Sequence, residues 1–284
     1  MPYASITCSK DGSEQHLFYE EYGSGDPVIL IHGWPLTHRA WESQLDALIE
    51  SGHRVITYDR RGFGQSSKPY GGYDYDTLAG DLNSLITSLN LSNVTIVGFS
   101  MGGGEVARYI GKFGTKKLKS AVLISAVTPF IKKTSDNPQG VDAGIFEEMK
   151  AGVRKDRFDF IANWRENYMS YDANKDTVSE KYLDFLWLQA SAALPKAMLD
   201  CITSFSNTDF RDDLKKCDVP LLVIHGTDDR ICSAEVCGKR VPEFAPNAQL
   251  ELIDGGPHGL TFTHSDQVNT LLTQFLAGET RAAA

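Results

Sequence analysis

The sequence contains no apolar run long enough to cross a bilayer, which takes about 20 residues. Apolar stretches such as Val28-Ile29-Leu30-Ile31 are much shorter. Residues 1–12 are polar and lack the apolar segment of a signal peptide. We therefore expect no membrane partner and a cytoplasmic location.

Cysteine is sparse and irregularly spaced. Five cysteines at spacings that fit no zinc motif predict neither a disulfide framework nor a metal site, and we expect reduced thiols. Neither H-E-x-x-H nor G-x-x-x-x-G-K-[ST] occurs, so metal and nucleotide cofactors have no support and we expect none. The cysteines are Cys8, Cys201, Cys217, Cys232 and Cys237.

Basic residues are outnumbered by acidic ones. The 28 lysines and arginines stand against 37 aspartates and glutamates, which gives a formal net charge of −9. A surface of this sign repels phosphate backbones and anionic lipid. We expect a small molecule, and no nucleic acid, as the partner.

The sequence does contain a regular alternation of short apolar runs and amphipathic segments. Runs of this length are typical of parallel strands buried on both faces. The intervening segments carry apolar residues at helical spacing, as Leu78, Leu82 and Leu85 do. This alternation predicts an α/β fold with a mostly parallel sheet covered by helices on both sides. The predicted strands are 27–31, 55–58, 94–97, 121–124, 221–224 and, more weakly, 249–253.

The two ends of the chain differ from this pattern. Residues 17–22 alternate differently, and we expect them to form an antiparallel edge hairpin with residues 5–9. Residues 281–284 resemble a frayed tail and do not enter the fold prediction.

One long region interrupts the alternation. Between about residues 126 and 219 no buried strand is predicted, and the segment is rich in charged and aromatic residues. Helical spacing fits several of its stretches. We predict a helical cap over residues 131–213, between core segments 1–130 and 214–284. Most of its aromatic side chains are expected to pack the cap onto the core, and a few to line a pocket.

A candidate nucleophile lies in Gly98-Phe99-Ser100-Met101-Gly102, which matches G-x-S-x-G. This segment follows the predicted strand 94–97 and opens a helical segment, so Ser100 lies on a sharp strand-to-helix turn. Small flanking residues let the strand and helix backbones pass closely. The helix N-terminus also favours developing negative charge. We predict Ser100 as the nucleophile.

A serine hydroxyl needs a base that removes its proton. Gly255-Gly256-Pro257-His258-Gly259 is a tight loop after the strand 249–253, and His258 projects from it. Among the other histidines, His225 ends a buried strand, and His32 lies in a strand-end motif where a structural hydrogen bond is expected. We predict His258 as the general base.

The base needs an acid that orients its imidazole, and this acid is expected after the preceding strand. The strand 221–224 continues as His225-Gly226-Thr227-Asp228-Asp229, so two adjacent aspartates compete. We choose Asp229, because G-x-x-D places its carboxylate at the far end of the turn. Asp228 is interpreted as a turn residue.

Acyl transfer also needs N–H donors aimed at the developing oxyanion. Met101 supplies one directly after the nucleophile, and Trp34, at the end of the strand 27–31, supplies the second. Pro35 follows Trp34 and has no N–H to donate. The bulk of Trp34 beside the nucleophile suggests a short acyl group. The predicted pocket walls are Trp34, Val127, Ile131, Trp164, Tyr168 and Ile231.

A further signal is carried by five segments: His32-Gly33-Trp34-Pro35-Leu36, Tyr58-Asp59-Arg60-Arg61-Gly62-Phe63-Gly64, residues 98–105, Val127-Thr128-Pro129 and Pro257-His258-Gly259-Leu260. Together these segments resemble the cofactor-free haloperoxidase and arylesterase group of α/β hydrolases, and the resemblance covers nearly the whole chain. The resemblance implies the α/β-hydrolase fold, with about eight strands and a helical cap. It also implies Ser100, Asp229 and His258 as a catalytic triad, and Trp34 and Met101 as the oxyanion hole.

The same resemblance implies hydrolysis of small carboxylic esters without metal or haem. It also implies perhydrolysis, in which hydrogen peroxide replaces water at the acyl-enzyme and the released peracid oxidises halide. A proline at the position of Pro35 recurs in members with strong perhydrolase activity, and homo-oligomers are common. The chain departs from the family at Ile231-Cys232-Ser233, where a proline is usual, which affects the pocket wall and not the triad.

Other functions on this fold stay open at this point. A lactonase, a γ-lactamase or a C–C bond hydrolase keeps the same three residues, and a non-catalytic ligand receptor keeps the fold. Haloalkane dehalogenases and epoxide hydrolases need a carboxylate nucleophile, so Ser100 argues against both.

Overall fold

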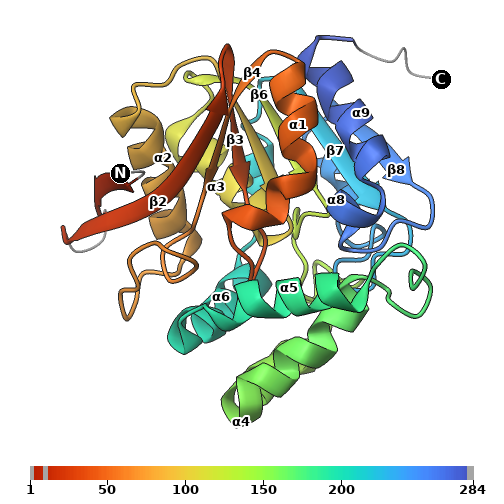
Figure 1. The fold of residues 1–284 in the computed structure, drawn as a ribbon. Coiled ribbons are helices and arrows are strands. Elements are labelled where there is room, and N and C mark those ends of the chain that lie inside the picture. The colour runs from red at the N-terminus through yellow and green to blue at the C-terminus, as the bar shows by residue number, and fades with distance from the viewer. Residues whose placement is uncertain (1–2, 9–11, 280–284) are drawn as a thin grey trace.

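The computed structural model describes residues 3–8 and 12–279, which form a sheet with helices on both faces (Figure 1). Its strands are β1 Tyr3–Thr7, β2 Glu14–Gly23, β3 Asp26–Ile31, β4 His53–Tyr58, β5 Val94–Phe99, β6 Leu118–Ile124, β7 Leu221–Gly226 and β8 Ala248–Ile253. Within the described ranges these eight strands lie in the order β1-β2-β4-β3-β5-β6-β7-β8. Strands β3 to β8 run parallel to one another, while β1–β2 and β2–β4 pair antiparallel.

This sheet confirms the predicted fold class. Each predicted parallel strand falls within one of the strands from β3 to β8, and β5 and β7 are buried along their whole length because helices cover both faces. The predicted hairpin is the β1–β2 pair, in which Tyr3 lies opposite Phe18 and Thr7 opposite Glu14. Ser9 of that prediction, and the tail 281–284, lie outside the described residues.

The flanking helices pack their apolar faces on the sheet. In α2, the predicted stripe Leu78, Leu82 and Leu85 is buried. Figure 1 shows α1 and α9 on one face and α2 and α3 on the other. Among the residues described, no helix combines the length and the apolar content that a bilayer-spanning segment requires. The helical elements are η1 His38–Trp41, α1 Glu42–Glu50, α2 Tyr75–Ser88, α3 Met101–Phe113, α4 Ala143–Tyr168, α5 Glu180–Ser191, α6 Pro195–Asn207, α7 Arg211–Leu214, η2 Gly238–Glu243, α8 Leu260–Thr263 and α9 Ser265–Leu276.

Three helices between β6 and β7 form a separate group. Figure 1 shows α4, α5 and α6 together beyond one end of the sheet. The helix α4 is broken at Asp156, whose backbone is non-helical at φ −158° and ψ 97°. The Asp156 carboxylate accepts hydrogen bonds from the N–H groups of Phe158 and Asp159, so it caps the second half of the helix. The segment boundary predicted at residue 213 falls inside α7, which contacts α3.

A buried ion pair ties β4 to α3. Arg60 Nε lies 2.8 Å from Glu105 Oε2, and both side chains are about 1% exposed. The hydroxyl of Tyr58 donates to the other carboxylate oxygen of Glu105. Arg60 also donates from Nη2 to the carbonyl of His32, at 2.7 Å, beyond the end of β3. The pair therefore links the ends of β3 and β4 to the helix that follows β5.

We expect Glu105→Gln to lower the free energy of unfolding by about 3–5 kcal/mol, because it leaves the buried Arg60 guanidinium without a counter-charge. Urea titration followed by circular dichroism measures this loss. Lys215→Ala is the matched control, since it breaks only the exposed pair with Asp212 and should leave the midpoint unchanged. Equal midpoints for wild type and Glu105→Gln would contradict the expectation.

Candidate active site

Ser100 lies on the turn between β5 and α3, in a backbone conformation that residues other than glycine rarely adopt. Its φ is 53° and its ψ is −118°. Backbone hydrogen bonds hold this conformation: Ser100 N donates to Ile124 O at 2.9 Å, and its carbonyl accepts from Gly103 N at 3.0 Å. The surrounding strand and helix thus enforce the sharp turn at Ser100 that the G-x-S-x-G pattern predicts.

Two glycines make the turn possible because backbones approach one another there. A Cβ on Gly98 would lie 2.4 Å from the carbonyl oxygen of Gly102. A Cβ on Gly102 would lie 2.4 Å from the carbonyl oxygen of Ile31, the last residue of β3. Both positions exclude a side chain, which explains the glycines of the motif in physical terms.

Gly102→Ala is expected to lower kcat/KM for ester hydrolysis by about 10²-fold, because the methyl group pushes α3 away from β3 and misplaces Ser100. Steady-state kinetics on p-nitrophenyl acetate measure the effect. Gly71→Ala is the matched control, since a Cβ there meets no atom within 4 Å. A Gly102→Ala variant as active as Gly71→Ala would contradict the close-approach argument.

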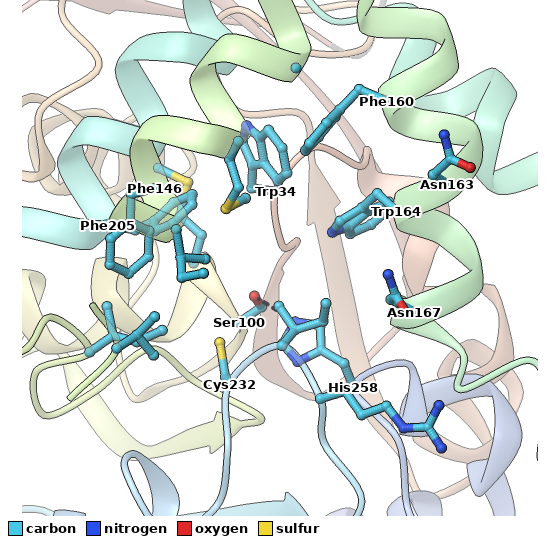
Figure 2. A pocket seen from close by; sticks show the side chains of 18 of the residues that line it. Trp34, Ser100, Phe146, Phe160, Asn163, Trp164, Asn167, Phe205, Cys232 and His258 are labelled. Atoms are coloured by element: carbon cyan, nitrogen blue, oxygen red, sulfur yellow. Dashed lines mark hydrogen bonds between the residues drawn. The ribbon is translucent and has the colours of Figure 1, made fainter. Parts of the chain in front are cut away.

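His258 connects the serine to a carboxylate. Its Nε2 lies 2.9 Å from Ser100 Oγ, and its Nδ1 lies 2.8 Å from Asp229 Oδ2. The ring is 1% exposed and packs against Phe99 and Tyr168, with centroids 5.1 and 5.4 Å away. Figure 2 shows Ser100 beside the His258 ring at the cavity surface. The structure therefore brings the three residues predicted as a triad into one hydrogen-bonded chain.

The Asp229 carboxylate is held as an anion. Its Oδ1 accepts from the N–H groups of Ile231 and Cys232, at 2.9 and 2.7 Å. Burial raises the pKa of this carboxyl, but the adjoining His258 and His225 outweigh it and hold the pKa below its ordinary value. Asp228, by contrast, is partly exposed and lies 3.5 Å from Arg230. The geometry favours Asp229 over its neighbour as the partner of the imidazole.

His225 contributes a contact that the sequence did not reveal. Its Nε2 lies 2.6 Å from the Cys232 carbonyl and 3.3 Å from Asp229 Oδ2, and the ring is fully buried. It thereby fastens the loop that carries Asp229. His225 precedes Asp229 by only four residues, which could have indicated a contact between them. Its place at the end of a buried strand, however, gave no sign of which group it would contact.

The loop after β3 presents a backbone donor from Trp34. The carbonyl of Gly33 accepts from Leu36 N at 3.0 Å and contacts His32 Nδ1 at 2.8 Å. Arg60 N donates to His32 Nε2 at 3.0 Å, so the ring proton is on Nδ1 and points to Gly33. Burial lowers the pKa of His32 to about 3, which keeps the ring neutral. The structural hydrogen bond predicted for His32 is therefore present.

The direction of the Trp34 N–H follows from this arrangement. In a planar trans peptide the C=O and the N–H point in opposite directions. Because the Gly33 carbonyl is fixed on one side, the Trp34 N–H is directed to the other. The N–H of Met101 is the first of α3, so no carbonyl within the helix accepts a hydrogen bond from it. Trp34 and Met101 both line the cavity that contains Ser100.

A cavity of about 650 Å³ opens at Ser100 and His258. Of the predicted walls, Trp34, Val127, Ile131, Trp164 and Ile231 line it. The prediction for Tyr168 is wrong, because its ring lies behind Trp164, with centroids 4.7 Å apart, and packs on His258. Trp164 and Tyr168 are four residues apart on one face of α4, so the first covers the second.

The cavity also has walls that the sequence analysis did not assign. They include apolar side chains of the helical segment, which was expected chiefly to pack against the core, and also polar side chains of the same segment, such as Asn163 and Asn167. Cys232 adjoins Ser100 in Figure 2, within the loop where the chain departs from the family that it resembles. The main additional lining residues are Val141, Phe146, Met149, Phe160, Phe205 and Cys232. Within residues 3–8 and 12–279, no group of three or more His, Cys, Asp and Glu side chains is arranged to hold a metal ion.

Comparison with known proteins supports the family resemblance. The chain matches the α/β-hydrolase fold model over residues 26–265. It is 42% identical to the non-heme chloroperoxidase CPO-A1 of Kitasatospora aureofaciens, over 95% of this chain and 98% of that protein. It is 36% identical to the bifunctional esterase/perhydrolase DCH of Acinetobacter calcoaceticus, over 94% and 98%. The crystal structure of a bromoperoxidase from Bacillus anthracis has a TM-score of 0.92 at 47% identity, over 97% and 99%. The chain thus belongs to the α/β-hydrolase family, in its group of non-heme haloperoxidases and esterase/perhydrolases.

Proposed function

We propose that this enzyme is a cofactor-independent serine esterase for small carboxylic esters, with perhydrolase activity. The observation that carries the proposal is the hydrogen-bonded chain from Ser100 through His258 to Asp229 at the surface of a largely apolar cavity. One relative is named an esterase/perhydrolase, which is the same pair of activities, and another is named a non-heme chloroperoxidase.

Acylation is the first half of the proposed reaction. His258 Nε2 takes the proton of Ser100 Oγ as that oxygen attacks the ester carbonyl. Negative charge develops on the carbonyl oxygen, and the N–H groups of Trp34 and Met101 stabilise it. Asp229 stabilises the imidazolium that forms. The imidazolium then protonates the leaving alcohol, and the acyl group stays on Ser100.

Deacylation uses the same groups in reverse. His258 removes a proton from water, which attacks the acyl-Ser100 carbonyl and releases the carboxylic acid. Hydrogen peroxide at the same position releases a peracid instead. The released peracid then oxidises halide in a step that uses no group of the protein. Water and peroxide therefore compete for one intermediate.

The cavity limits which esters fit. Trp34 is held close to the nucleophile by the hydrogen bond from its Nε1 to Met198 O, at 3.2 Å. This position supports the proposal of a short acyl group. We further propose that residues 131–213 act as a cap whose helices provide most of the apolar wall, including Phe146 and Phe160.

The test is ester hydrolysis in the presence of a chelator. We expect turnover of p-nitrophenyl acetate and butyrate to exceed that of the octanoate and to be insensitive to EDTA. Bromination of monochlorodimedone, in acetate buffer with hydrogen peroxide and bromide, tests the perhydrolase activity. Absence of turnover with every ester, or loss of turnover on chelation, would refute the proposal.

A further inference from the structure

Trp164 has an indole N–H without a partner inside the described part of the chain. Its side chain is 7% exposed and lines the cavity. The indole N–H groups of Trp34 and Trp187 donate to the carbonyls of Met198 and Phe158, at 3.2 and 3.1 Å. Unlike the unpartnered nitrogen of Trp41, the Trp164 nitrogen is not fully enclosed. Figure 2 shows it at the ring edge that faces the cavity.

The neighbours of Trp164 place it on the His258 side of the cavity. Its ring packs on Tyr168, with centroids 4.7 Å apart, and Tyr168 packs on His258 at 5.4 Å. The Trp164 ring also lies edge-on to Trp34, with centroids 5.9 Å apart, so it stands between Trp34 and Tyr168. The leaving alcohol must receive its proton from His258 Nε2. The alcohol part of a bound ester therefore lies on this side, while Phe146 and Phe205 pack together at another wall, at 6.2 Å.

We propose that the Trp164 indole N–H donates a hydrogen bond to an oxygen in the alcohol part of the substrate. The enzyme then selects esters whose alcohol carries an ether, hydroxyl or carbonyl oxygen over hydrocarbon alcohols of equal size. An all-carbon alcohol displaces water from the indole and leaves this mostly buried donor unsatisfied. This inference deepens the proposed esterase function and depends on it.

The experiment compares 2-methoxyethyl acetate with n-butyl acetate, which differ by one oxygen in place of one methylene. We expect Trp164→Phe to lower the ratio of their kcat/KM values by about 3–10-fold relative to wild type, the range for one hydrogen bond. Comparing this ratio between the variant and the wild type cancels the different intrinsic reactivities of the two leaving groups. Trp187→Phe is the matched control, because its indole N–H lies outside the cavity, and it should leave the ratio unchanged.

A second ester pair tests the assignment to the alcohol side. p-Nitrophenyl methoxyacetate and p-nitrophenyl butyrate carry the same replacement in the acyl part. An unchanged ratio for the alcohol pair, or a shift found only in the acyl pair, would overturn the inference while leaving the esterase function intact. A wild type inactive on all four esters would overturn both.

The wild-type protein alone provides an independent measurement should Trp164→Phe fail to fold. The acyl-enzyme formed from p-nitrophenyl acetate partitions between 2-methoxyethanol and 1-butanol offered at equal concentration. We expect the methoxyethyl ester to form at least about 3-fold faster. Equal rates for the two alcohols would overturn the inference.

Discussion

Replacing Ser100 by alanine is expected to reduce kcat/KM for p-nitrophenyl acetate by about 10⁴–10⁶-fold, as for other serine triads. Without the hydroxyl, His258 has no nucleophile to activate, and only the N–H donors of Trp34 and Met101 remain to assist water. Steady-state kinetics in EDTA measure the loss, and circular dichroism checks that the variant keeps the wild-type fold.

A covalent probe gives the same prediction a second readout. A fluorophosphonate should label wild type once, on the peptide that contains Ser100, and should not label Ser100→Ala. Ser191→Ala, in α5 and away from the cavity lining, is the matched control and should be labelled as fast as wild type. Labelling of Ser100→Ala, or turnover by this variant near the wild-type level, would mean that another residue is the nucleophile.

Asp229→Asn is expected to lower kcat by about 10⁴-fold with little change in the fold. The amide nitrogen of asparagine can donate to His258 Nδ1, which shifts the ring proton to Nε2 and leaves no base facing Ser100. The N–H groups of Ile231 and Cys232 can still reach the amide oxygen, so the loop keeps its hydrogen bonds.

The adjacent aspartate provides the control for this prediction. Asp228→Asn removes a charge one residue away, but that carboxylate pairs with the partly exposed Arg230 and does not contact His258. Its kcat should stay within about 2-fold of wild type, because exposed ion pairs contribute little. A larger loss in Asp228→Asn than in Asp229→Asn would show that the acid is misassigned.

The fold could be predicted from the sequence because parallel strands covered on both faces are short, continuous apolar runs. The same logic located the chemistry, since Ser100, Asp229 and His258 each follow a predicted strand. Parallel strands bring their carboxyl ends to one edge of the sheet. Knowing that each of the three residues follows a parallel strand was therefore enough to predict that they lie close together.

The walls of the cavity were harder to predict, because they depend on how helices are placed relative to one another. Trp164 and Tyr168 are both aromatic and lie on the same face of one helix, so the sequence does not distinguish them. Only packing decides that Trp164 lines the cavity and that Tyr168 supports His258. The break at Asp156 is similar, since a carboxylate can cap a helix or lie exposed within one. Such choices rest on tertiary contacts that no local pattern encodes.

The ion pair of Arg60 and Glu105 has a consequence for how fast the chemistry proceeds. Arg60 holds His32, which fixes the peptide of Trp34, while Glu105 lies one helical turn after Met101. The two N–H donors are therefore set at a fixed spacing by one internal brace, before any ester arrives. Dipoles held in this way need not reorganise when charge appears on the carbonyl oxygen. Weakening the Arg60–Glu105 pair would therefore lower kcat for acyl transfer and leave KM unchanged.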